Sequence, residues 1–69
     1  MDYLKQAKII IKTEMAKADV DYPKLVERLK EIGIDETREN LANKINRGKF
    51  SFAFALQVFK VLGSKKIEL

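Results

Sequence analysis

Apolar residues recur at helical spacing along most of the chain. The first such segment runs from Asp2 to about Ala18, where apolar positions follow one another every three or four residues. Its apolar stripe consists of Leu4, Ala7, Ile10, Ile11, Met15 and Ala18, and four lysines face away from it, at Lys5, Lys8, Lys12 and Lys17. The pattern predicts a long amphipathic helix with one buried face.

A second, shorter helix is marked at both ends by residues that start and stop helices. Asp21 is a good N-cap, and Pro23 lies in the first turn, where its missing N–H is not needed. Gly33 is placed to take the left-handed conformation that ends a helix. The apolar stripe between these residues is Leu25, Val26, Leu29 and Ile32.

Two further helices are expected before the C-terminal tail. One runs from Thr37 to Arg47, is capped by Thr37 or Asp35, and buries Leu41, Ala42 and Ile45. The other runs from Ser51 to Leu62 and is apolar nearly all round. Because no strand-like alternation persists for more than a few residues, we predict an all-α fold of four or five helices in a single domain, residues 1–69.

A helix that is apolar on every side is either central or shared with a partner. We predict that the last helix turns Phe52, Ala55, Leu56, Phe59 and Leu62 toward the core. This choice leaves a second apolar side made of Phe54, Val58 and Val61, which we predict to be a homodimer interface. The alternative is a monomer in which Ile67 and Leu69 fold back over that side.

Composition argues against an enzyme. The chain has no Cys and no His, no carboxylate pair with a reason to share a pocket, and single glycines at helix ends instead of a phosphate-binding loop. We therefore expect no catalytic residues, metal, cofactor or small-molecule ligand. The longest apolar runs are far shorter than the ~20 residues that span a bilayer. With no signal-peptide pattern and no Cys, we expect a cytoplasmic protein without a membrane association.

The polar residues of the third helix are of types that read bases and bind phosphates. Asn presents an amide donor and acceptor together, which pairs with adenine, and Arg pairs with guanine. We predict base contacts from Arg38, Asn40, Asn43 and Lys44, and phosphate contacts from Thr37, Arg47 and Lys49. In the alternative interpretation, Asn40 and Asn46 hydrogen-bond within the fold and the cations are solvated surface. The net charge of +4 permits a polyanionic partner without requiring one.

Residues 20–63 resemble the lambda-repressor-like helix-turn-helix domains of the Cro/C1 class. The resemblance is carried by three segments: Asp21-Tyr22-Pro23-Lys24-Leu25-Val26, Asn43-Lys44-Ile45-Asn46-Arg47-Gly48 and Val58-Phe59-Lys60-Val61-Leu62-Gly63. They stand where that class opens its second helix, ends its reading helix and closes its last helix. The whole chain resembles more closely a small bacterial family of stand-alone domains of unknown function, marked by a similar Asn-Leu-x-Asn-Lys-Ile-x-Arg-Gly-x-Phe-Ser segment (residues 40–51).

The resemblance implies a lambda-repressor-like fold and a small regulator of transcription whose third helix enters the major groove of double-stranded DNA. The sequence departs from the class in one way that bears on this function. The turn before the third helix is longer than usual, because the interval from Val26 to Gly33 is about one helical turn longer and Ile34-Asp35-Glu36 adds a longer connection. This changes how the third helix is presented. The alternative function is a protein–protein adaptor that uses the same fold without DNA, favoured by the modest charge and by Glu36 and Glu39 at the start of the reading helix.

Overall fold

The computed structural model describes residues 2–69. In that range the chain forms four helices and no strand: α1 (Tyr3–Ala18), α2 (Tyr22–Glu31), α3 (Arg38–Arg47) and α4 (Phe52–Leu62). The all-α prediction is confirmed, with helix ends within a residue or two of those expected from the sequence. None of the helices in the described range has the length and apolar character needed to cross a membrane.

Each helix begins at a side chain that accepts a hydrogen bond from the backbone N–H three residues later. The donors are Lys5, Lys24, Asn40 and Phe54, and their acceptors are the N-caps Asp2, Asp21, Thr37 and Ser51, at 3.0–3.1 Å. The predicted caps Asp21, Thr37 and Ser51 are confirmed, and Thr37 is the cap of α3 instead of Asp35. Because each cap satisfies a backbone donor left unpaired in the first turn, these four residues fix where the helices start.

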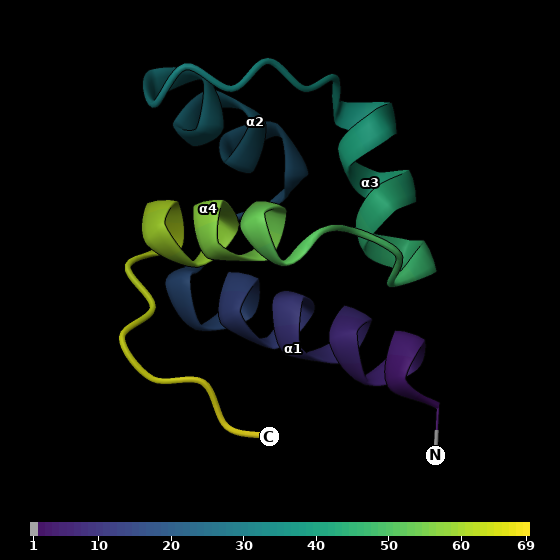
Figure 1. The fold of residues 1–69 in the computed structure, drawn as a ribbon. Coiled ribbons are helices and arrows are strands. Elements are labelled where there is room, and N and C mark those ends of the chain that lie inside the picture. The colour runs from purple at the N-terminus through teal and green to yellow at the C-terminus, as the bar shows by residue number, and fades with distance from the viewer. Residues whose placement is uncertain (1) are drawn as a thin grey trace.

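Within the described residues, four pairs of helices are in contact, and each pair joins α1 or α2 to α3 or α4. Both α1 and α2 contact α3 and α4, so α4 lies between α1 and α2 while α3 stands across one end of this layer (Figure 1). The molecule measures 34 × 24 × 20 Å. In this arrangement only one side of α3 is needed for packing, and its other side is left to solvent.

The core takes its largest buried side chains from all four helices. Those that are fully buried are Ile11, Leu25, Leu29, Leu41, Ile45 and Val58. Two members of the predicted stripes are instead substantially exposed: Leu4 at 46% and Ile32 at 42%. Leu4 lies in the first turn of α1 and Ile32 is the C-cap of α2, so both stand at helix ends beyond the packed middle of the fold.

The prediction of which side of α4 faces the core is confirmed only in part: Ala55 and Leu62 are buried and Phe59 packs against the core, but Phe52 and Leu56 do not. Phe54 and Val58 are buried, at 6% and 0% exposure, whereas Phe52 and Leu56 are 76% and 53% exposed. The helix carries apolar residues almost all round, and only its two polar residues, Gln57 and Lys60, mark a solvent side. The predicted dimer surface of Phe54, Val58 and Val61 is therefore not a surface, because two of these side chains belong to the core of one chain and Val61 is half-buried.

The C-terminal tail, residues 64–69, turns back from the end of α4 toward α1 (Figure 1). Ser64 Oγ donates a hydrogen bond to Glu14 Oε1 at 2.8 Å, and Gln6 Nε2 donates one to the Leu69 carbonyl at 3.3 Å. The hydrogen bond from Ser64, followed by that from Lys17, holds the pKa of the Glu14 carboxyl below its ordinary value of 4.5. The tail is thus tied to α1 at both of its ends.

Candidate nucleic-acid interface

The exposed side of α3 is a polar strip that runs the length of the helix. Leu41 and Ile45 are fully buried and define the packed side. Residues four apart lie above one another on a helix, and the side opposite the core carries such a series: Glu39, Asn43 and Arg47. All three are exposed, as are the flanking residues Asn40 and Asn46. We refer to these five residues as the α3 strip.

The two arginines of α3 stand at its opposite ends. Arg38 is the first residue of the helix and Arg47 the last, and both are exposed. At 1.5 Å per residue the two positions are about 14 Å apart along the axis, with Asn40 and Asn43 between them. An open hollow of about 550 Å³ at the N-terminal end is lined by Thr37, Arg38, Glu39 and Ala42. Nine residues correspond to about two and a half turns, so the two arginines also start from opposite sides of the helix.

The three asparagines of α3 are free to meet a ligand. Their side chains are exposed, and within residues 2–69 none of them takes part in a side-chain hydrogen bond. Asn40 takes part in the N-cap through its backbone N–H, which donates to the Thr37 hydroxyl, and not through its side chain. The alternative in which Asn40 and Asn46 are structural hydrogen-bonding residues is therefore wrong for their side chains.

Lys44 does not lie in the α3 strip with the residues predicted to face bases. Its ammonium forms an ion pair with Glu36, whose side chain is only 9% exposed, and stands 4.9 Å from the centroid of the Phe54 ring. Both partners come from outside α3, from the connection before it and from the start of α4. Lys44 is thus held by contacts within the chain, and its predicted place among the base-facing residues is corrected.

Glu39 is the residue of the strip whose place the sequence interpretation did not recognise. From the sequence it counted only as a charge at the start of the reading helix that favours an adaptor, but its spacing of four from Asn43 puts it on the same side of α3. This spacing was readable in the sequence. A carboxylate there lowers the positive potential of the strip, and it is also a group that accepts a hydrogen bond from the cytosine amino group.

The C-terminal end of α3 is held rigidly against α1. Gly48 is buried, has a positive φ of 68°, and lies against the backbone of Leu4. A Cβ at this position would overlap the Leu4 carbonyl oxygen and stand 2.7 Å from its carbon. The exposed Lys49 follows directly, so its position next to Arg47 is set by this contact between the two helices.

Together these features define a small all-α domain that presents one polar helix to solvent. The chain belongs to the family described as a domain of unknown function (DUF6471), which matches residues 3–67 and so includes all four helices. This assignment agrees with the sequence resemblance to a small family of stand-alone domains of unknown function. Searches of curated proteins and of solved structures found no match.

Proposed function

We propose that this domain is a small DNA-binding regulator that inserts α3 into the major groove of double-stranded DNA. The observation that carries the proposal is the α3 strip, in which the unpaired amides of the three asparagines lie beside the exposed Arg47 on the side of the helix that packing does not use. A major groove about 12 Å wide admits an α-helix.

Each residue of this surface has a role in the proposal. Asn40 and Asn43 face bases from the middle of the helix, and Arg38 reaches a base edge from its start. Arg47 and Lys49 bind phosphates at the other end, and Thr37 donates its hydroxyl to a phosphate beside the first turn. Lys44 supports this surface from behind, through Glu36 and Phe54, without contacting DNA.

The arrangement of α2 and α3 supports a lambda-repressor-like helix-turn-helix. The two helices are in contact and are joined by residues 32–37, while α1 and α4 hold them from the other side (Figure 1). This connection is longer than that of the class it resembles. Because α3 packs against both α1 and α2 and is fixed by Gly48, the longer connection does not leave the helix loose.

A second function, a protein–protein adaptor, is favoured by two observations. Glu39 lies within the α3 strip, and the net charge is only +4, so the surface is less cationic than a purely phosphate-binding one. Long-range attraction to DNA is correspondingly modest.

Salt dependence separates the two functions. Titration of a fluorescent random-sequence duplex at several salt concentrations should show binding whose logarithmic dependence on salt has a negative slope. Arg47→Ala should flatten that slope by about one unit, as expected for one lost phosphate contact, and Lys24→Ala on α2 serves as the matched surface control. Affinity weaker than ~10⁻⁴ M for every duplex at physiological salt would instead favour the adaptor.

A further inference from the structure

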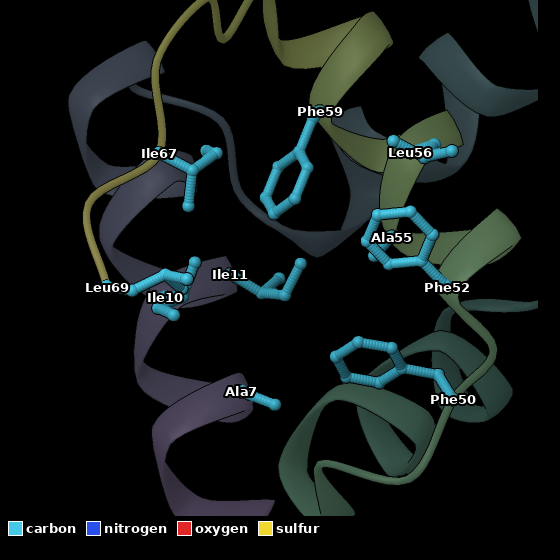
Figure 2. A pocket seen from close by; sticks show the side chains of 10 residues that line it. All are labelled: Ala7, Ile10, Ile11, Phe50, Phe52, Ala55, Leu56, Phe59, Ile67 and Leu69. Atoms are coloured by element: carbon cyan, nitrogen blue, oxygen red, sulfur yellow. The ribbon is translucent and has the colours of Figure 1, made fainter. Parts of the chain in front are cut away.

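An apolar groove opens between α1, α4 and the C-terminal tail (Figure 2). It has a volume of about 390 Å³, and every side chain that lines it is apolar. Ile11 forms its floor, Phe59 and Ile67 border one end, and Phe50, Phe52 and Leu56 border the other (Figure 2). None of the lining residues belongs to α3, so the groove is separate from the surface proposed to bind DNA.

The rim of this groove carries the most exposed apolar residues of α4. Phe52 is 76% exposed and Leu56, one helical turn later, is 53% exposed. Leu69, at the tail side of the groove, is 96% exposed. Single exposed apolar residues need no explanation, but a contiguous set around a concave site is typical of an interaction surface.

The tail covers this groove only in part. Ile67 is half-buried against it, and the tail is anchored by the hydrogen bonds of Ser64 to Glu14 and of Gln6 to Leu69. The tail side of the groove is therefore closed by the chain itself. The side bordered by Phe52 and Leu56 remains open, and no other segment of residues 2–69 lines it.

The exposed area is too small for a stable dimer. With about 150–250 Å² for a whole aromatic side chain, Phe52, Leu56 and Leu69 together expose on the order of 400 Å². A standard interface buries roughly 800 Å² on each partner. A single helix needs much less, because it docks through a few apolar anchors spaced three, four and seven residues apart.

The charges beside the groove distinguish the kinds of helix that fit. Lys60 and Lys66 are exposed and directly adjoin the lining residues Phe59 and Ile67 in the chain. The one acidic neighbour in the chain is Glu68, which also lines hollows on the α1 side of the tail. A second copy of the chain would place its own lysines against the lysines beside this groove, whereas an acidic segment would complement their positive charge.

We propose that this groove binds an amphipathic helix of a partner protein, with an apolar stripe that packs on Phe52 and Leu56 and acidic side chains along its flanks. The apolar anchors supply the affinity, and Lys60 and Lys66 select an acidic partner over a basic one. Since α3 takes no part, the domain can hold this partner while its reading helix is occupied.

The test uses the full chain and two synthetic helical peptides of about 14 residues, four turns in length. Both carry the same leucine stripe, and their remaining positions are Glu in one peptide and Lys in the other. Fluorescence anisotropy should show saturable binding of the Glu peptide with a Kd tighter than ~1 mM, and binding of the Lys peptide at least about tenfold weaker. Phe52→Ser and Leu56→Ser should each weaken binding of the Glu peptide at least about tenfold.

Three controls make the result decisive. Ile32→Ser changes an exposed apolar residue of α2 outside the groove and should leave peptide binding unchanged. Circular dichroism of each variant confirms that the fold is retained, as expected for side chains that are already exposed. Amide chemical shifts of the wild type should change along the groove when the Glu peptide is added.

Several results would overturn the proposal. They are failure of the Glu peptide to bind below ~1 mM, equal binding of the two peptides, or binding that survives Phe52→Ser. Sedimentation equilibrium provides the remaining one: a wild-type dimer that Phe52→Ser dissociates would show that a second copy occupies the groove. Failure of any of these tests leaves DNA binding through α3 unaffected.

Discussion

Gly48 lies directly against the backbone carbonyl of Leu4, so the end of α3 meets the first turn of α1 with no room for a side chain between them. This contact fixes the angle of α3 relative to the rest of the fold. It also combines two demands on one residue, a positive φ of 68° and a close backbone approach. Only glycine satisfies both.

Gly48→Ala should therefore lower the free energy of unfolding by more than ~3 kcal/mol. The left-handed backbone alone costs about 1–2 kcal/mol for a residue with a Cβ, and the overlap with Leu4 adds to it. Gly63→Ala is the matched control, because Gly63 has a similar φ of 74° but nothing within 4 Å of a Cβ. Urea unfolding of both variants checks this, and equal losses would show that the contact with Leu4 contributes nothing.

Lys44→Ala should mainly lower stability, whereas Lys49→Ala should mainly lower DNA affinity. Lys44→Ala removes the ion pair with Glu36 and the contact with the Phe54 ring, and should cost about 1 kcal/mol of stability. Its effect on DNA affinity should be smaller than that of Lys49→Ala, which removes an exposed cation and should leave stability nearly unchanged. Thermal unfolding and duplex titration of both variants give the comparison. The reverse order of DNA effects would return Lys44 to the binding surface.

Glu14 should make the attachment of the tail sensitive to acid. Its pKa in the folded chain is held below 4.5, chiefly by the hydrogen bond from Ser64 and next by that from Lys17. A lowered pKa adds stability above pH 4.5 that is lost as the pH falls through the folded value. Ser64→Ala should raise the pKa of Glu14 and lower stability near neutral pH, measured by NMR titration and urea unfolding. Lys17→Met should also raise that pKa, and an unchanged pKa in both variants would contradict the assignment.

Tyr22 presents a buried hydroxyl that makes no hydrogen bond within the described residues. A buried unpaired polar group costs about 1–3 kcal/mol, whereas removing it and keeping the ring retains the packing. Tyr22→Phe should therefore leave stability unchanged or increase it by up to about that amount. Tyr3→Phe, at a position 73% exposed, should have no effect. A clear loss of stability in Tyr22→Phe would show that the hydroxyl has a partner.

The helix boundaries could be predicted from the sequence because local chemistry determines them. Asp21, Thr37 and Ser51 each satisfy a backbone donor a few residues away, and Gly48 and Gly63 end their helices with positive φ. These interactions depend only on near neighbours in the chain. The class of the fold followed from them.

The side of α4 that faces the core could not be predicted in the same way. Phe52 and Phe54 are equally apolar, and only the positions of α1 and α2 decide which of them is buried. The place of Lys44 depends likewise on Glu36 and Phe54, which lie eight and ten residues away in the chain. Both errors concern contacts between elements, which periodicity along one helix does not contain.

Selection of binding sites from random duplex DNA tests the proposed role of α3 most directly. The wild type and Asn43→Ala are selected in parallel, with Lys30→Ala on the exposed surface of α2 as the control. We expect an enriched motif for the wild type and the control, and the loss of preference at one position of that motif for Asn43→Ala, at ~1–3 kcal/mol per lost bidentate contact. The absence of any enriched motif, or a motif that Asn43→Ala leaves unchanged, would contradict base reading by this helix.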